Sequence, residues 1–352
     1  MKEQNINILQ NLIEIPSPSG YENDIAKHIK KYLSSFISED KIEIDFRNNV
    51  IVKINKGHKH TIIIDAHLDQ LGFLVNNITK DGYISICSVG GYDRSILRGR
   101  KVVFIEKPNL KGVIGAKPVH LIENTVSEIP SKVSDLNLDI GIRKYSKISK
   151  LIKPGDPLIF QPSFTKLNED YVVGDGFDDK AGCFILIQLI KALVKENPKV
   201  NIVFTFSSRE EIGCLGAIEL ARRFKPDLYI GIDVGFATDV PDANEKSTGK
   251  AHCGNGLVIS RGIHIHKKAE ELLTKIANSD KNIKVQYEAA NGRGGTNARS
   301  VATELNGIPI LDLGIPLRYM HTQVEMLNLK DLEMGIRLLN KFLLHRTLRN
   351  II

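Results

Sequence analysis

The sequence predicts an α/β fold in which helices cover both faces of a largely parallel sheet, interrupted by a small antiparallel β domain. Two observations carry this prediction. Amphipathic helical segments alternate with apolar strand-like runs near the start of the chain and again from about residue 171. Between these parts, residues 71–165 hold short β-like runs broken by Gly, Pro and Asn. We therefore expect an α/β domain made of residues 1–68 and 167–352, and a β-barrel-like insertion at residues 69–166.

The first α/β segment begins with two expected helices. Residues 5–14 place isoleucine and leucine on one helical face, and IPSPSG then ends the helix. YENDIAKHIKKYLSSF has a similar amphipathic pattern. In KIEIDF, VIVKIN and TIIIDAHLD the period shortens toward two, which predicts strands. The last of these runs is almost wholly apolar, as in a strand buried on both faces.

The remaining elements follow the same criteria. The expected strands of the insertion are GFLVNNI, GYISICSV, RKVVFIE, GVIGAK and PLIFQP, with one short helix near RKYSKISKLI. In the second α/β segment the expected helices are DDKAGCFILIQLIKALVKE, GCLGAIELARRF, HKKAEELLTKIANSD and LKDLEMGIRLLNKFLLHRTL. The strands expected between them are KVNIVFTFS, DLYIGIDVG, IKVQYEA and IPILDLGI.

Composition excludes several classes of protein. The chain has 352 residues, of which 42% are hydrophobic and 25% charged, as in a globular protein with more than one core. Its net charge is +7, but the lysines are scattered rather than interleaved with aromatic residues, which argues against a nucleic-acid partner. The four cysteines form no CxxC pair, so we expect neither a disulfide framework nor a zinc knuckle. The absence of a leader-like start or an 18-residue apolar run predicts a cytoplasmic protein with no membrane partner.

Histidines and carboxylates follow several of the expected strands or precede a helix. In chain order they are His67, Asp69, Asp178, Asp179, Glu210, Glu211, Asp233 and His321. Taken singly, each has a structural explanation, such as a hydrogen-bonded histidine or a helix N-cap. Ligands of open α/β sheets, however, bind outside the carboxyl ends of the strands, where these residues would meet. Two histidines and several carboxylates without a thiolate form a ligand set for two divalent cations that share one carboxylate.

Five motifs in order, DAHLDQLGF, GDGFDDKAG, SREEIGCLGA, GIDVGFATDVP and RYMHTQVE, resemble those of the M42 metallo-aminopeptidases, which include glutamyl aminopeptidase and the tetrahedral (TET) peptidases. The resemblance covers essentially the whole chain. It implies a zinc-exopeptidase-like three-layer αβα catalytic domain that removes N-terminal residues from peptides. It also implies two divalent metal ions per chain, Zn²⁺ in preference to Co²⁺. The implied assembly is a homo-oligomer, a dodecamer built from dimers, with the inserted domain at interfaces.

The resemblance also implies a role for each site residue. The metal ligands would be His67, Asp178, Glu211, Asp233 and His321. Asp178 would bridge the two ions, with His67 and Asp233 completing one site, and Glu211 and His321 the other. Glu210 would be the general base and later the acid, so that one of two adjacent glutamates binds metal and the other moves a proton. Asp69 would orient the imidazole of His67.

Two positions depart from the family pattern, and a third suggests a specificity. Gln70 stands where Glu is usual, and Asn297 stands in GGTNA where GGTDA is usual, so each removes a negative charge near the site. Arg293 lies in the same glycine-rich loop. If its guanidinium faced the pocket, it would pair with a substrate carboxylate and favour N-terminal Glu or Asp. The alternative is that Arg293 faces solvent.

Three other functions fit parts of the sequence. An M20-type carboxypeptidase or deacylase would use the same metal scaffold, but its extra domain usually lies between the third metal carboxylate and the last histidine. Here the long interval lies between His67 and Asp178. An endoglucanase would need a sugar platform rich in aromatic residues, and the chain has no Trp. A non-catalytic shell subunit would not need all five ligands and the base.

Overall fold

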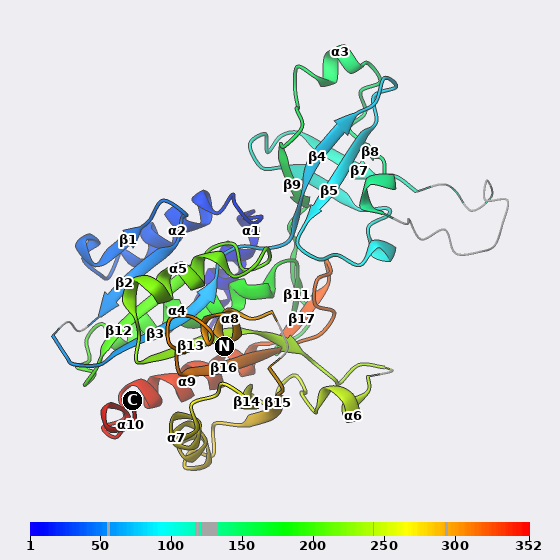
Figure 1. Ribbon diagram of the computed structural model, residues 1–352. Helices are drawn as coiled ribbons and strands as arrows, with labels where there is room; N and C mark the ends of the chain where they lie inside the picture. The colour runs from blue at the N-terminus through cyan, green and yellow to red at the C-terminus, as the bar shows by residue number, and fades with distance from the viewer. Residues whose placement is uncertain (55–56, 117, 119, 121–131, 242, 293–294) are drawn as a thin grey trace.

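The computed structural model describes residues 1–54, 57–116, 118, 120, 132–241, 243–292 and 295–352. In Figure 1, a layered α/β part fills the lower half of the molecule, and a β-barrel stands away from it at the upper right. This arrangement confirms the predicted fold class, a three-layer αβα domain with a small antiparallel β domain.

An eight-stranded sheet forms the middle layer. In spatial order its strands are β1 (Ile42–Ile44), β2 (Val50–Ile54), β12 (Asn201–Ser207), β3 (Thr61–His67), β13 (Leu228–Phe236), β16 (Ile310–Leu317), β14 (Leu257–Gly262) and β15 (Val285–Ala290). The four central strands, from β12 to β16, are parallel neighbours, so their carboxyl ends lie at one edge. The antiparallel pairs are β1 with β2, β2 with β12, and β14 with β16.

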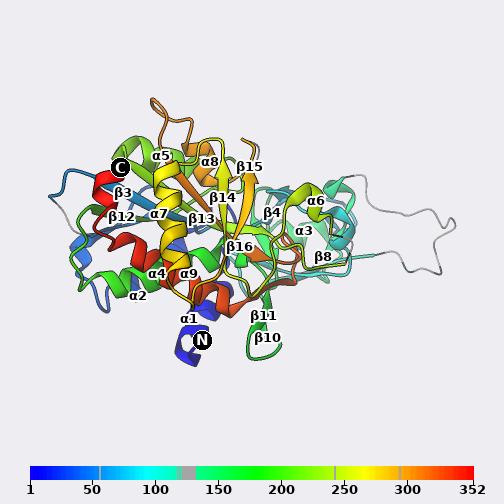
Figure 2. The same cartoon turned by 90° about the horizontal axis from the view of Figure 1, so that it is seen from below.

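Helices cover both faces of this sheet. One face packs against α1 (Glu3–Glu14), α2 (Asn23–Leu33), α4 (Phe177–Leu193), α7 (Lys267–Asn278) and α9 (Leu329–Leu343). The other packs against α5 (Leu215–Phe224) and the five-residue α8 (Asn297–Val301). Figure 2 shows α7 and α9 beside the β14–β15 edge. Alternation along β3 explains the two layers, because Ile62 and Ile64 join the first core while Ile63 joins the second.

The barrel has a hydrophobic core of its own. Its strands, in order around the barrel, are β4 (Gly72–Ile78), β5 (Ile84–Val89), β8 (Leu138–Asp139), β7 (Lys111–Ile114), β6 (Lys101–Phe104) and β9 (Pro157–Phe160). Inside it, the rings of Phe73 and Phe160 meet edge to face with centroids 5.3 Å apart. Four-residue helices lie at α3 (Tyr145–Ile148), α6 (Glu245–Thr248) and α10 (Leu348–Ile351).

A three-stranded sheet connects the barrel to the α/β layers. It contains β10 (Phe164–Lys166), β11 (Tyr171–Gly174) and β17 (Glu325–Asn328). The chain runs from β11 directly into α4, and β17 follows the segment that carries His321. This sheet therefore brings the start of α4 close to the connection between β16 and β17. The sequence patterns did not predict this sheet, β14 or α8.

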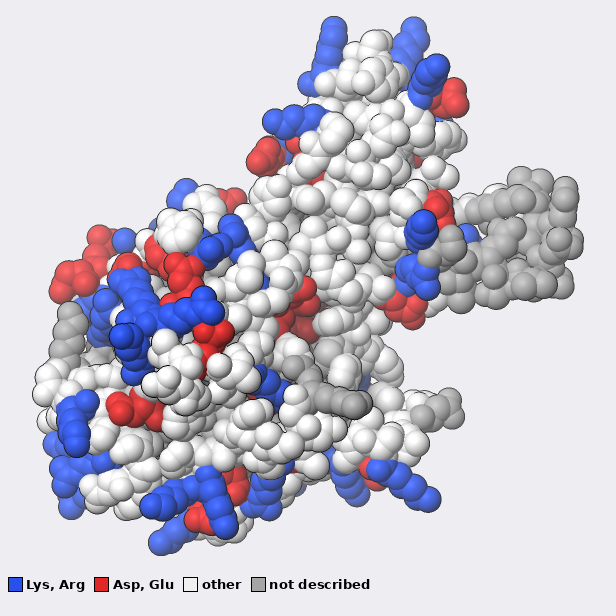
Figure 3. Space-filling view, in the orientation of Figure 1, with Lys and Arg blue, Asp and Glu red and all other residues white. Residues whose placement is uncertain are grey.

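Two surface properties bear on partners. No helix within the described residues is long and apolar enough to cross a membrane. On the face drawn in Figure 3, Lys and Arg side chains are interspersed with Asp and Glu rather than gathered in one basic stripe. The described cysteines are all free thiols, and three of them are buried.

Candidate metal centre and active site

The carboxylate of Asp178 lies between two histidines. Its Oδ1 is 3.0 Å from Nε2 of His67, which ends β3. Its Oδ2 is 3.2 Å from Nε2 of His321, which follows β16. Asp178 is the second residue of α4, where the backbone has not yet adopted helical angles. The two oxygens of one carboxylate thus face nitrogen donors from two different parts of the chain.

A further carboxylate accompanies each histidine. Oδ1 of Asp233, on β13, lies 3.7 Å from Nε2 of His67. Oε2 of Glu211 lies 3.9 Å from Nε2 of His321. His67 and His321 thus each have one further carboxylate nearby, and Asp178 lies between the two histidines. Donor atoms of His67, Asp178 and Glu211 all lie within 4.8 Å of one another, close enough to hold a metal ion.

Asp179, next to the shared carboxylate, is engaged by the backbone. Its Oδ2 accepts a hydrogen bond from the amide of His67 at 3.2 Å, and its Oδ1 accepts one from the amide of Gly182 at 3.0 Å. It also lies within 4.8 Å of His67 and Asp233 and belongs to the second group of potential metal donors. Because both its oxygens already accept hydrogen bonds, Asp179 fits a supporting position between β3 and α4 better than a primary ligand position.

Asp69 contacts both halves of the site. Its main-chain carbonyl lies 2.9 Å from Nδ1 of His67, closer than its own carboxylate at 3.6 Å. That carboxylate instead accepts hydrogen bonds from the amides of Glu210 at 2.9 Å and Glu211 at 3.2 Å, and from the Ser19 hydroxyl at 2.6 Å. Asp69 thus positions the imidazole through its backbone and the adjacent glutamates through its side chain.

The adjacent glutamates occupy a tight connection between β12 and α5. Arg209 precedes them with a φ of 61°, and Gly213 follows with a φ of 118°. Burial is the main cause that raises the pKa of Glu210 to about 8; His67 opposes the rise, and the negative charges of Asp233, Asp178 and Asp69 add to it. Burial and the charge of Asp178 hold the pKa of Glu211 well above its usual value.

These pKa shifts give a test of whether the residues fit a metal pair. Carboxylates that are buried together repel one another, and their pKa values rise unless a cation compensates. Oε1 of Glu211 is buried with no hydrogen-bond partner among the described residues. Nitrogen and carboxylate donors without a thiolate suit Zn²⁺ and other divalent ions of the first transition row. The residues therefore fit a pair of divalent cations.

Glu325 is a supporting residue that the sequence reasoning did not single out. It begins β17, is buried, and lies four residues after His321. Its Oε1 accepts a hydrogen bond from the His321 amide at 2.9 Å, and its Oε2 accepts from the amides of Gly176 at 3.1 Å and Asp178 at 3.3 Å. One side chain therefore ties the two segments that face each other across the site. Glu325 is the final glutamate of the motif RYMHTQVE, so the motif itself could have identified it as a site residue.

The side chain of Gln70 accepts a hydrogen bond from the ammonium group of a buried lysine. Its Oε1 accepts hydrogen bonds from Nζ of Lys180 and from the amide of Ser17. Nζ of Lys180 also donates to the carbonyl of Ile15 at 2.7 Å. A neutral amide thus stands where the family pattern would give the lysine a carboxylate.

Asn297, at the start of α8, donates to a carboxylate beneath it. Its Nδ2 lies 2.9 Å from Oδ2 of Asp65 and 2.9 Å from the hydroxyl of Ser207. Burial raises the pKa of the Asp65 carboxyl. An aspartate at position 297 would place a second carboxylate against that of Asp65. The asparagine instead supplies an NH₂ group that donates a hydrogen bond to it.

A cavity of about 310 Å³ contains the candidate site. Five predicted residues line it, namely Asp178, Glu210, Glu211, Asp233 and His321. Polar residues from β14, β15, α8 and β16 line it further away: Ser260, Glu288, Arg299 and Asp312. The sequence reasoning named none of these four. Arg293, which it did name, lies outside the described residues.

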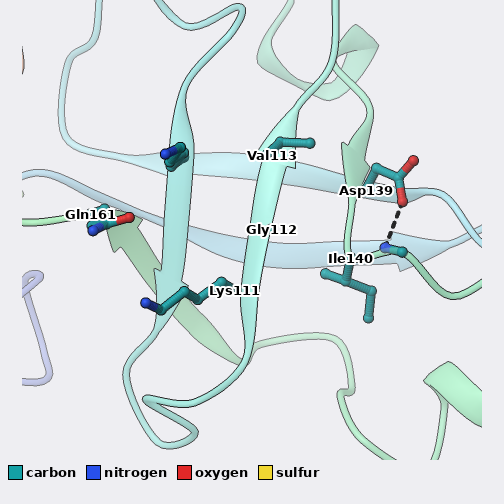
Figure 4. Close-up of a pocket in the computed structure, with 8 residues that line it drawn as sticks. Lys111, Gly112, Val113, Asp139, Ile140 and Gln161 are labelled. Atoms are coloured by element: carbon teal, nitrogen blue, oxygen red, sulfur yellow. Dashed lines mark hydrogen bonds between the residues drawn. The ribbon is translucent and has the colours of Figure 1, made fainter.

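A larger hollow, of about 610 Å³, lies on the barrel (Figure 4). It is lined by Lys111, Val113, Ile140 and Gln161 among others, and Asp139 there accepts a hydrogen bond from the amide of Gly141 at 2.8 Å. It holds no histidine and a single carboxylate. Each of the two potential metal-binding groups in the described residues includes at least one residue that lines the smaller cavity, Asp233 in one group and Asp178 and Glu211 in the other.

Known proteins resemble this chain over almost its whole length. A model of the M42 glutamyl aminopeptidase family matches residues 48–338. The lysyl aminopeptidase of Pyrococcus furiosus is 30% identical over 94% of this chain and 94% of its own. Among solved structures, a TET aminopeptidase from a marine sediment Thaumarchaeota archaeon has a TM-score of 0.90 and 25% identity, covering 99% of both chains. The Pyrococcus horikoshii TET1 peptidase, described as able to assemble into a tetrahedron or a large octahedral shell, has a TM-score of 0.85 and 32% identity over 97% of this chain and 99% of its own.

These comparisons confirm the resemblance found in the five motifs. The family model spans both the α/β layers and the inserted barrel, so the match concerns the chain as a whole. Relatives named aminopeptidase cover the same extent. The chain therefore belongs to the M42 peptidase family and is a hydrolase of the aminopeptidase class.

Proposed function

We propose that this protein is a two-metal aminopeptidase that releases N-terminal residues from peptides. The single observation that carries the proposal is the position of Asp178, with one carboxylate oxygen facing His67 and the other facing His321. Bridging carboxylates of co-catalytic metal pairs need this arrangement, because each oxygen binds a different ion.

The proposed ligands divide into two sets. His67 and Asp233 would hold one ion, Glu211 and His321 would hold the other, and Asp178 would contact both. We propose Zn²⁺ as the metal, with Co²⁺ as the alternative, because every donor is an imidazole nitrogen or a carboxylate oxygen. When bound, two such ions polarise the scissile carbonyl and lower the pKa of a water molecule at the site.

Glu210 is the proposed general base. It lies in the same cavity as the ligands, and neither histidine nitrogen is within ion-pair distance of its carboxylate among the described contacts. Its carboxylate would accept the proton of the attacking water and then deliver it to the leaving amine. Asp69 would keep it in place, since the Asp69 carboxylate accepts the amide hydrogen of Glu210.

We also propose a homo-oligomer, a dodecamer built from dimers, with the barrel at its interfaces. The assemblies described for TET1 of Pyrococcus horikoshii support an oligomer. The barrel projects from the catalytic layers (Figure 1) and exposes apolar side chains such as Val113 and Tyr145. We place the protein in the cytoplasm with peptides as its substrates, and we propose neither nucleic acid nor membrane as a partner.

The test of the proposed activity compares two substrates that differ only at the α-amine. Metal-reconstituted protein should release p-nitroaniline from leucine p-nitroanilide and not from its N-acetylated form, because an aminopeptidase must bind a free amine. An M20-type deacylase or carboxypeptidase would not make this distinction, and a non-catalytic shell subunit would cleave neither compound. Equal cleavage of both, or cleavage of neither, would contradict the proposal.

A further inference from the structure

We propose that the site prefers peptides with an N-terminal lysine or arginine, and that Glu288 contacts the side-chain cation. This inference rests on the proposed aminopeptidase function and names its substrate class. The observation behind it is a set of polar side chains that lines the active-site cavity beyond the metal-ligand residues. This second row consists of Ser260, Glu288, Arg299 and Asp312.

Strand register places this row. Asp233 pairs with Gly314 across β13 and β16, and two residues earlier Gly231 pairs with Asp312. Residues two apart on a strand point to the same face and are separated by about 7 Å. Asp312 therefore protrudes from the same face as the proposed ligand Asp233, one step further from the carboxyl edge.

The row continues across β14 to β15. The hydroxyl of Ser260 on β14 donates to Oε1 of Glu288 at 2.7 Å and lies 3.4 Å from Oδ2 of Asp312. Ser260 and Glu288 are also register partners in the β14–β15 pair. Three adjacent strands thus present a serine and two carboxylates to one end of the cavity.

The row has more negative than positive charge. Nε of Arg299 lies 2.7 Å from Oδ2 of Asp312, and its Nη2 lies 2.9 Å from Oε1 of Glu288. One guanidinium thus faces two carboxylates, which leaves a surplus of one negative charge. The side chain of Asp312 is only 5% exposed, whereas that of Glu288 is 34% exposed. Glu288 is therefore the carboxylate that a ligand in the cavity can reach.

The layout of the cavity suits a long cationic side chain, because Glu288 and the metal-ligand residues line the same space. A substrate whose α-amine and scissile carbonyl lie at the metal centre directs its first side chain into the same cavity. The four-carbon stem of lysine carries its ammonium about 6 Å from the α-carbon, away from the metal-ligand residues and into the cavity that Glu288 also lines. An N-terminal glutamate would bring a third carboxylate to the row, and a leucine would leave Glu288 without a cationic partner.

This inference revises the expectation of an acidic preference, which depended on Arg293. Within the described residues, the guanidinium that lines the cavity is that of Arg299, and two carboxylates already bind it. Names of relatives do not decide the matter, since the family model is described as glutamyl aminopeptidase and one relative is named lysyl aminopeptidase. Among the described residues, the charge of this row favours a cation.

The experiment measures kcat/KM for Lys-, Leu- and Glu-p-nitroanilides with the metal-reconstituted full-length enzyme. We expect Lys to exceed Leu by roughly 10-fold and Glu to be the poorest substrate, because a charged hydrogen bond to a partly exposed carboxylate gives discrimination of this order. The Lys-to-Leu ratio should fall as ionic strength rises, since salt screens an accessible ion pair. A ratio at or below one, or a Glu preference, would overturn the proposal while leaving the aminopeptidase function intact.

Two variants with the same charge change identify the residue. Glu288→Gln keeps an oxygen for the Ser260 hydroxyl, and we expect it to lower the Lys-to-Leu ratio roughly 10-fold. Glu271→Gln removes an exposed charge on α7, outside the cavity, and should leave the ratio unchanged. Inhibition of Leu-anilide cleavage by free lysine should weaken in Glu288→Gln alone. An unchanged ratio in Glu288→Gln would refute its role, and failure of the wild type to cleave any anilide would refute the proposed function and this inference together.

Discussion

Asp178 and His321 meet at 3.2 Å, although 143 positions separate them along the chain. The contact depends on Glu325, whose carboxylate accepts the amide hydrogens of both residues. Because His67 contacts the other oxygen of Asp178, the start of α4 is the point at which the two halves of the site meet.

Asp178→Asn should lose metal. An amide offers one oxygen and one NH₂ group, so it cannot present an acceptor to two ions at once. We expect the variant to bind fewer than two ions per chain while it stays folded. Elemental analysis after gel filtration checks this, and two equivalents of metal in the variant would show that Asp178 is not a bridge.

Glu210→Gln should retain both ions and lose about 10²- to 10⁴-fold in kcat, which is the usual contribution of a positioned acid–base group. Glu211→Gln is the matched control, because the same chemical change at the neighbouring residue removes a proposed ligand and should lower metal content. Metal analysis and kcat are measured on both variants. Near-native turnover in Glu210→Gln would exclude it as the base.

The metal-free protein should lose stability as pH rises from about 4.5 to 7. Burial raises the pKa of Glu22 to about 7 and that of Asp175 to about 7. Between their unfolded and folded pKa values these groups bind more protons in the folded state, so their contribution to the free energy of unfolding is complete below about pH 4 and falls as pH rises toward 7. Each contributes on the order of 3–4 kcal/mol over this range.

Glu22→Gln isolates one of these groups. The amide keeps an oxygen for the Gly20 amide, which Glu22 accepts at 2.7 Å. Urea unfolding of the variant should therefore depend less steeply on pH than that of the wild type. Glu271→Gln, at an exposed position, should leave the profile unchanged. A profile in Glu22→Gln as steep as that of the wild type would contradict the assignment.

Asn297→Asp should destabilise the protein by about 1–3 kcal/mol, because it replaces a donor to the buried Asp65 by a second carboxylate. Combining it with Asp65→Asn exchanges the two groups and restores one donor and one acceptor. Thermal unfolding of the single and double variants should then show a positive coupling between the sites. Additive losses would mean that the two side chains do not interact.

The sequence predicted the central sheet well and the pocket poorly, for physical reasons that particular residues illustrate. TIIIDAHLD and IVFTFSSREE pair an apolar strand with polar residues at its carboxyl end, so the strands β3 and β12 could be predicted, together with the candidate ligands that follow them. β14 was not predicted because LVISRG is short, lies between glycines and shows no clear period. α8 was not predicted because it spans only five residues. Ser260, Glu288 and Asp312 lie on three different strands, and only the register brings them together.

Metal titration of the apoenzyme tests the central claim most directly. Protein stripped by a chelator is titrated with Zn²⁺ or Co²⁺ while metal content and the release of p-nitroaniline from a free aminoacyl anilide are followed together. The account predicts no activity without metal and a rise that reaches its maximum at two ions per chain in the wild type, with Asp178→Asn inactive throughout. Full activity in the metal-free protein, or saturation at one ion per chain, would contradict it.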